Sequence, residues 1–140
     1  MQGDQSHLVE GITPGFIRYI STKKHRHSTT NDHNKWRKGV NAVSQQKIAA
    51  IAVVGRFSAP DGSHWGACES LPTLGTEPRQ RMAFFPPPKN PNDPEHGYPI
   101  SALDPKRLVE HTPPIAVIDG WREAGIVSEI DAIRLSRGKI

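Results

Sequence analysis

The sequence of 140 residues contains a single cysteine, Cys68, so the chain cannot form a disulfide within itself. Small proteins of oxidising compartments usually depend on several disulfides. A lone cysteine is more typical of a reducing compartment, where it serves most often as a small core residue. The cysteine content therefore predicts a cytoplasmic protein and does not favour Cys68 as a nucleophile.

Long apolar segments are also missing. No apolar run approaches the ~20 residues that a membrane-spanning helix needs. The first ten residues are polar, unlike a signal peptide. Hydrophobic residues make up 35% of the chain, and glycine and proline together account for 25 of its 140 residues. We therefore expect one soluble domain over residues 1–140, with a modest core, much irregular structure and no membrane partner.

Four segments rich in β-branched and aromatic residues predict strands of a small antiparallel sheet: residues 16–21, 51–57, 64–70 and 81–85. The second belongs to an apolar run whose start suits a helix from Asn41, and a short apolar run alone does not decide between helix and strand. Between the second and third segments, the run Ala-Pro-Asp-Gly-Ser predicts a tight turn, because proline presets φ and glycine permits a positive φ. We expect a hairpin there.

Helix signals dominate the last third of the chain. Asp104 followed by Pro105 is a helix start, since aspartate caps free amides and proline needs no hydrogen bond at the first helical position. Two prolines before Ile115 open a second helix that Gly125 closes, and Ser128 caps a third. The residues expected to face the core from these last two helices are Ile115, Ile118, Trp121, Ile130, Ile133 and Leu135.

The remaining segments predict loops. Residues 1–14 form a partly flexible tail, and residues 22–39 have almost no apolar side chains, which indicates an exposed loop. Residues 86–99 contain six prolines, which cannot donate hydrogen bonds to a sheet. The chain as a whole predicts an α+β fold, in which a small antiparallel sheet packs against C-terminal helices and carries long basic and proline-rich surface loops.

Positive charge is concentrated in one histidine-rich segment, residues 18–39, called here the basic stretch. It holds seven lysines and arginines against one acid, Asp32, a net charge of +6. The whole chain carries +4, so all other residues together carry −2. A local positive field of this kind is typical of proteins that bind polyanions.

These residues predict a small nucleic-acid-binding protein, with RNA or DNA as the partner. Lysine and arginine neutralise phosphates, and Trp36 is suited to stacking on a base. Contacts of this kind predict affinity with little sequence selectivity and a steep dependence on salt. The expected nucleic-acid-binding residues are Lys23, Lys24, Arg26, Lys35, Trp36, Arg37 and Lys38.

An alternative function is a metal-independent ribonuclease or toxin-like phosphodiesterase. Such an enzyme needs a base, an acid and a cation for the charge that develops on phosphorus. His25 or His27, with neighbouring basic residues and a carboxylate such as Glu69, would supply them. No spacing in the chain is diagnostic of a nuclease, so these residues stay candidates.

Two other sites are disfavoured by spacing. His25, His27 and His33, or His64 with Cys68, are zinc-ligand types, but the chain has neither Cys-x-x-Cys nor His-Glu-x-x-His. We therefore assign no metal and no cofactor. Residues 121–139 have the outline of a helix-turn-helix, but the pattern suits an amphipathic helix packed on the sheet better.

A third function needs no nucleic acid. The basic stretch would also fit the acidic surface of a protein partner, in an inhibitor or an assembly component. The sequence leaves the choice among binding protein, enzyme and protein-interaction module open.

Overall fold

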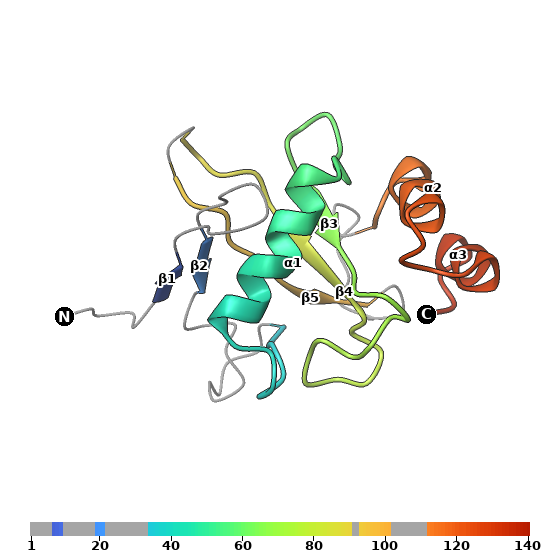
Figure 1. Ribbon diagram of the computed structural model, residues 1–140, viewed down its shortest axis with the longest axis horizontal. Helices are drawn as coiled ribbons and strands as arrows, with labels where there is room; N and C mark the ends of the chain where they lie inside the picture. The colour runs from blue at the N-terminus through green and yellow to red at the C-terminus, as the bar shows by residue number, and fades with distance from the viewer. Residues whose placement is uncertain (1–6, 10–18, 22–33, 91–92, 102–111) are drawn as a thin grey trace.

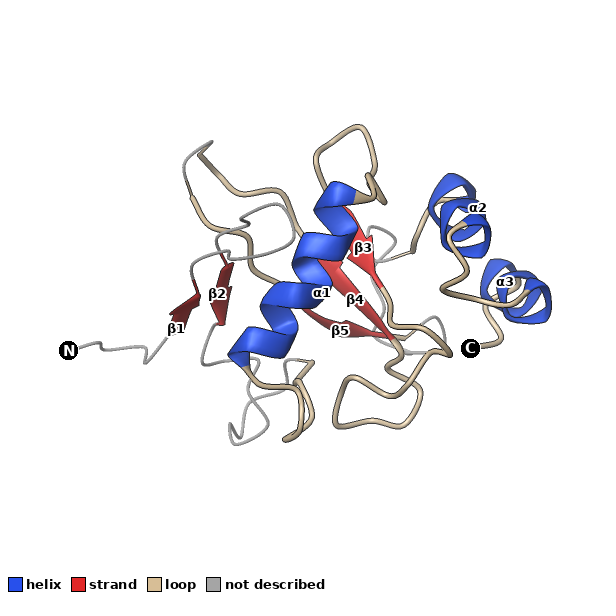
Figure 2. Cartoon of the chain, in the orientation of Figure 1, coloured by secondary structure: helices blue, strands red, loops and turns tan. Residues whose placement is uncertain are grey.

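The computed structural model describes residues 7–9, 19–21, 34–90, 93–101 and 112–140. Within them, an antiparallel sheet of three strands is covered by one long helix on one face and contacts two C-terminal helices from the other (Figures 1 and 2). This is the expected α+β class. The order along the chain is β1 (His7–Val9), β2 (Tyr19–Ser21), α1 (Ala42–Val54), β3 (His64–Gly66), β4 (Met82–Phe85), β5 (Tyr98–Ile100), α2 (Ile115–Glu123) and α3 (Glu129–Ser136).

Strand β4 lies at the centre of the sheet and is antiparallel to β3 on one side and β5 on the other. All four of its side chains are buried. Because side chains alternate along a strand, Met82 and Phe84 join one core cluster and Ala83 and Phe85 join another. A strand buried on both faces explains why its sequence is continuously apolar rather than alternating.

Helix α1 corrects the strand expected at residues 51–57. Asn41 caps the helix by accepting the backbone N–H of Ser44 at 3.0 Å, and the helix continues to Val54. The apolar run lacks a helical period because α1 buries Gln45 and Gln46 and leaves Ile51 and Val54 exposed, by 39% and 54%. It packs on β3 through Ile48, which lies against Gly66, and it also contacts β1 and β2. Glutamines on the buried face and apolar side chains on the exposed face remove the 3.6-residue pattern that identifies an amphipathic helix.

The predicted turn at residues 59–63 is present, with Gly62 at φ +94° and the Asp61 carboxylate accepting the N–H of Ser63. It leads from the end of α1 into β3, and a short pairing lies across it: the bridge from Ser58 to His64 and the hydrogen bond from the N–H of Trp65 to the carbonyl of Phe57 at 2.8 Å. The main partner of β3 is β4, so the expected hairpin of two long strands is wrong. The strand expected at 64–70 extends only over His64–Gly66, and the one at 81–85 is β4.

Strands β2 and β5 differ from expectation in their pairing. Of the strand predicted at 16–21, the described residues form β2, which pairs with β1 in a sheet of its own. The proline-rich segment, predicted as a loop, ends in edge strand β5, where Pro99 lies opposite Ala83. An edge strand tolerates proline because one side of its backbone needs no ladder hydrogen bond. The helix expected after Asp104 lies outside the described residues.

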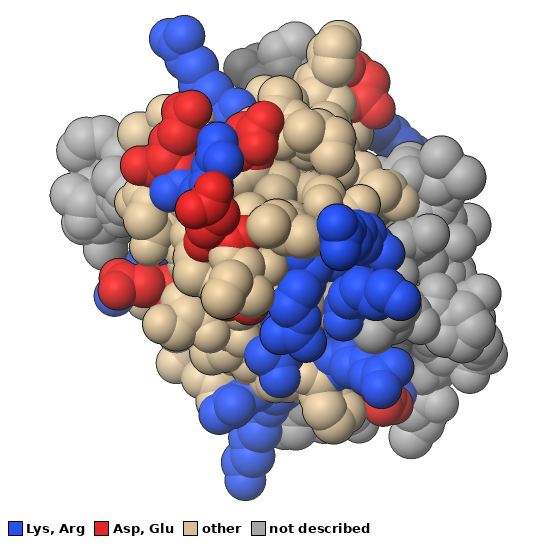
Figure 3. Space-filling model, turned by 90° about the vertical axis from the view of Figure 1, so that its right-hand side faces the viewer, with Lys and Arg blue, Asp and Glu red and all other residues tan. Residues whose placement is uncertain are grey.

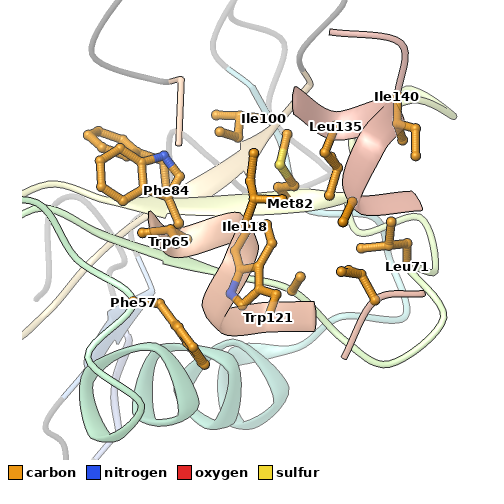
Figure 4. Packing of buried hydrophobic residues seen from close by; sticks show 14 residues of the cluster. Phe57, Trp65, Leu71, Met82, Phe84, Ile100, Ile118, Trp121, Leu135 and Ile140 are labelled. Atoms are coloured by element: carbon orange, nitrogen blue, oxygen red, sulfur yellow. The ribbon is translucent and has the colours of Figure 1, made fainter. Parts of the chain in front are cut away.

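The two C-terminal helices begin and end where the sequence indicates. Ser128 caps α3 by accepting the N–H of Asp131 at 3.1 Å, and Gly125 closes α2 at φ +78°. Trp121 of α2 lies edge-on to Phe57, with ring centroids 6.3 Å apart, beside the sheet residues of the larger cluster (Figure 4). Leu135 of α3 belongs to the same cluster, so both helices are held by one core.

The inward faces of these helices are only partly as predicted. Ile118, Trp121 and Leu135 are buried, but the other three isoleucines are not. The exposed fractions of Ile115, Ile130 and Ile133 are 58%, 70% and 46%. Each helix is about two turns long and packs along one narrow face, on which Val117 and Ala132 occupy the positions expected for isoleucines.

Arg56, just after the end of α1, has a backbone conformation that is unfavourable for a residue with a side chain. It follows the helix with φ +59°, while the N–H of Phe57 donates to the carbonyl of Ala52 at 3.0 Å. A left-handed residue at this position is usually glycine, because a side chain costs roughly 1–2 kcal/mol there.

We expect Arg56→Gly to raise the free energy of unfolding by about 0.5–1 kcal/mol relative to Arg56→Ala, which removes the same charge but keeps the Cβ. Urea unfolding of the two variants measures the difference. An alanine variant as stable as the glycine variant would show that the conformation carries no strain.

Candidate functional site

Most of the sequence-predicted site falls in residues 22–33, outside the described part of the chain. Lys23, Lys24, Arg26, His25 and His27 all lie there, so their placement is not described. The described residues of the predicted nucleic-acid site are Lys35, Trp36, Arg37 and Lys38. They follow one another directly, and their environments differ sharply.

Trp36 is buried in the core, with only 1% of its surface exposed. Its indole N–H donates to the carbonyl oxygen of Gly97 at 3.2 Å, and its ring belongs to the cluster that includes Tyr19 and Phe85. A ring enclosed in this way has no free face for a base, so stacking by Trp36 does not agree with the structure. The sequence pattern missed this because a tryptophan among charged residues resembles a stacking site and a core anchor equally.

Arg37 and Lys38 are exposed in a short turn beside Trp36. The backbone N–H of Arg37 donates to the carbonyl of Leu74 at 2.9 Å, and the N–H of Thr76 donates to the carbonyl of Lys35 at 2.9 Å. The ion pairs found among the described residues include none of these three basic side chains. The turn therefore presents two cations on a backbone fixed to residues 74–76.

Both ends of the basic stretch are attached to one short segment, residues 95–97. At the beginning, the N–H of Ile20 donates to the carbonyl of Glu95 at 2.8 Å. At the end, Trp36 donates to Gly97. The two described ends of the most basic part of the chain thus lie beside the same three residues.

The same segment contributes half of a histidine–carboxylate pair. His64 begins β3 opposite Phe85, and Tyr98 begins β5 opposite Phe84, so the residues just before β5 reach the same end of the sheet as His64. Nδ1 of His64 lies 3.9 Å from Oε1 of Glu95. The two residues are 31 positions apart in sequence, and the register of the sheet brings them together.

These facing atoms are shielded from solvent and have no hydrogen-bond partner. The separation of 3.9 Å is longer than a direct hydrogen bond. Buried polar atoms in this condition are rare and costly, at about 1–3 kcal/mol each. The side chains are 18% and 14% exposed overall, so other atoms of each residue reach the surface.

Burial changes the proton affinity of both groups. It raises the pKa of Glu95 to about 7, because the carboxylate loses hydration. It lowers the pKa of His64, against smaller opposing effects from the Gly62 carbonyl and the Asp61 carboxylate. Near neutral pH, the pair therefore combines a partly protonated carboxyl with an unprotonated imidazole, an arrangement suited to acid–base chemistry.

The remaining sequence candidates are placed elsewhere. Glu69, the carboxylate suggested for catalysis, is exposed just after the half-buried Cys68, and burial raises the pKa of the Cys68 thiol. Within the described ranges, no group of three or more histidine, cysteine, aspartate or glutamate side chains has the arrangement of a metal site. His64 became a candidate in the sequence only as a zinc ligand, and no sequence signal connected it to Glu95.

A second group of basic side chains lies on the face that α2 and α3 present (Figure 3). The end of α3 and the residues after it supply Arg134, Arg137 and Lys139, all exposed. Arg134 lies 3.7 Å from Asp131, and on α2 Arg122 lies 3.8 Å from Asp119. Mixed charges of this kind, on helices whose buried faces pack on the sheet, agree with the amphipathic interpretation of the C-terminus.

Comparisons with protein-family models, with curated proteins and with solved structures found no match to this chain. Among the helices described, none has both the length and the apolar character required to cross a bilayer. Any functional assignment must therefore come from the residues and geometry above.

The buried carboxyl predicts a pH-dependent stability. Because the folded pKa of Glu95 is about 7 and the unfolded value is near 4.5, the folded state holds this proton more tightly. Stability is then greatest below the unfolded value and falls as the pH rises toward 7.

Glu95→Gln removes this ionisation with little change in shape. As the pH rises from 5 to 8, we expect the free energy of unfolding of the variant to increase relative to that of the wild type by on the order of 1–2 kcal/mol. The difference is modest because Glu95 is partly exposed to solvent. Urea unfolding at the two pH values measures it, with Glu69→Gln as the exposed-carboxyl control. Equal pH slopes for the wild type and Glu95→Gln would contradict a desolvated Glu95.

Proposed function

We propose that the protein binds nucleic acid through its phosphate backbone, using the basic stretch. The observation that carries the proposal is the attachment of both ends of this stretch to residues 95–97. The chain carries +6 between and beside these two anchors, while all other residues sum to −2. A positive field concentrated in one segment of a protein attracts a polyanion during encounter.

The proposed contacts are lysine and arginine side chains on phosphates. Arg37 and Lys38 are exposed and lie outside the ion pairs of the described chain, so binding to phosphate would not first require breaking such a pair. Lys23, Lys24, Arg26 and Lys35 complete the proposed set. Trp36 is excluded because its ring is enclosed, and without it no identified residue reads a base.

This set predicts binding that depends on charge more than on sequence. Each neutralised phosphate contributes about −0.9 to the slope of log K against log salt for duplex DNA, and about −0.7 for single strands. A nucleic-acid ligand and a single unpaired cysteine both suit a reducing compartment, and as part of the proposal we place the protein in the cytoplasm.

Fluorescence anisotropy with labelled single-stranded RNA, single-stranded DNA and duplex DNA at two salt concentrations tests the proposal. We expect the double variant Arg37→Ala/Lys38→Ala to bind duplex DNA roughly tenfold or more weakly at low salt, with a slope shallower by about 1.8, because two phosphate contacts are lost.

The matched control is Lys47→Ala/Arg122→Ala, which removes the same charge from exposed positions on α1 and α2. A control variant that weakens binding as much as the test variant would mean that net charge, and not this turn, is responsible. If none of the three polymers binds at low salt, the proposal is wrong, and an acidic protein surface becomes the expected partner.

A further inference from the structure

We infer that His64 and Glu95 form an acid–base pair that cleaves the phosphodiester backbone of RNA bound by the basic stretch. The inference rests on the proposed function and extends it from binding to catalysis. It also replaces His25, His27 and Glu69, the catalytic candidates of the sequence, with two residues that the fold brings together.

The geometry of the pair is the first argument. Two polar atoms face each other at 3.9 Å, shielded from solvent and without a hydrogen bond. A purely structural pair would gain by closing to hydrogen-bond distance. Unsatisfied polar groups in a native fold need a reason, and a catalytic role is one of several. The indole nitrogen of Trp121 is also unsatisfied, but it does not face a second titratable group as His64 and Glu95 do. The imidazole of His64 also interacts with the backbone of Gly62, in the turn that leads into β3.

The position of the pair is the second argument. Glu95 accepts a hydrogen bond from Ile20 through its backbone, and the basic stretch continues from that point. A phosphate backbone held at this described beginning of the stretch would lie near the end of the sheet where the pair is. Across the neighbouring turn, Gly62 lies close to Pro87, and Lys89 follows two residues later with an exposed side chain.

RNA is the polymer that this chemistry fits, because its 2′-hydroxyl is a nucleophile within the substrate. His64 takes the proton of the 2′-hydroxyl while the 2′-oxygen forms a bond to phosphorus. The bond between phosphorus and the 5′-oxygen breaks, and the Glu95 carboxyl gives its proton to that oxygen. The products are a 2′,3′-cyclic phosphate and a 5′-hydroxyl. His64 is left as the imidazolium and Glu95 as the carboxylate. Transfer of one proton from His64 to Glu95, directly or through solvent, restores the starting protonation states of the pair.

The protonation states agree with this assignment. Burial favours the protonated carboxyl of Glu95 and the neutral imidazole of His64 near pH 7. The reverse assignment, with carboxylate as base and imidazolium as acid, holds the same number of protons and gives the same pH profile, so the inference concerns the pair. The other titratable side chains that adjoin it are Asp61, whose charge acts on His64, and His96, the next residue after Glu95.

The expected pH profile is a bell. Cleavage rises as pH increases through the lowered pKa of His64, below 6.5, and falls as Glu95 loses its proton near pH 7. DNA lacks the 2′-hydroxyl, so it should bind and stay intact.

The test uses an end-labelled RNA oligonucleotide and its 2′-O-methyl counterpart, which lacks the nucleophile, with anisotropy and gel readings on the same samples from pH 5 to pH 8. We expect the RNA to be shortened, with 2′,3′-cyclic phosphate ends identified by mass spectrometry, and the 2′-O-methyl oligonucleotide to be bound intact. Glu95→Gln and His64→Gln should cleave at least 100-fold more slowly, in line with the ~10²–10⁴-fold contribution of a general acid or base.

Binding of the 2′-O-methyl oligonucleotide should change less than twofold in both variants, and Glu123→Gln, an exposed carboxyl on α2, should retain full cleavage. Circular dichroism and thermal melting identify a variant that fails to fold. If His64→Gln fails to fold, Glu95→Gln still decides, since its residual activity should no longer fall near pH 7.

Each outcome separates the inference from the proposed function. RNA that stays intact while the 2′-O-methyl oligonucleotide binds overturns the inference and leaves the proposed function standing. Cleavage that survives in folded Glu95→Gln and His64→Gln also overturns it. Cleavage without measurable binding supports the pair and contradicts stable binding, and the absence of both overturns both.

Discussion

The pairing of β4 with strands on both sides is the constraint on which the rest of the structure depends. Met82 and Phe84 project into the core shared with α2 and α3, and Ala83 and Phe85 project into the core shared with α1. Because a one-residue shift would exchange these two faces, the register of β4 is strongly determined. That register also sets which residues meet at the end of the sheet, so the His64–Glu95 contact is a consequence of packing in two separate cores.

The core cluster under α1, which contains Tyr19, Trp36 and Phe85, also includes buried polar groups. These groups connect the cluster to the basic stretch. The buried hydroxyl of Tyr19 donates to Gln45 at 3.0 Å, and the Gln45 amide donates in turn to the carbonyl of Val40 at 2.9 Å. Burial raises the pKa of Tyr19 well above its ordinary value, so this hydroxyl stays a donor. The indole of Trp36 likewise donates to the carbonyl of Gly97. One buried aromatic residue, Tyr19 or Trp36, therefore holds each end of the basic stretch in the core. The polar atoms are satisfied locally, and the apolar rings supply the packing.

Local chemistry predicted the boundaries of elements well, and non-local contacts explain what the sequence did not reveal. Ser128 and Gly125 act as a cap and a stop because those roles depend on one or two neighbouring residues. The end of α1 was predicted as a strand because its apolar pattern depends on what covers the helix. β5 was missed because the rule that proline avoids sheets does not apply at an edge. Glu95 had no sequence signal, since its burial and its contact with His64 arise from two strand pairings that no spacing encodes.

If the proposed binding and cleavage both occur, each would improve the conditions for the other. A phosphate near the pair adds negative charge, which favours the protonated form of any neighbouring group. A bound phosphate would therefore favour the protonated carboxyl of Glu95, which holds the proton that the leaving oxygen needs. The pKa of His64 would rise from its lowered value toward neutrality, which makes the imidazole a stronger base while a substantial part of it stays unprotonated. The effect of the phosphate would thus add to the effect that burial already has on Glu95. Acid–base competence would in that case be present in the free protein and increase on substrate binding, and it would depend on the low-dielectric position that the sheet register creates.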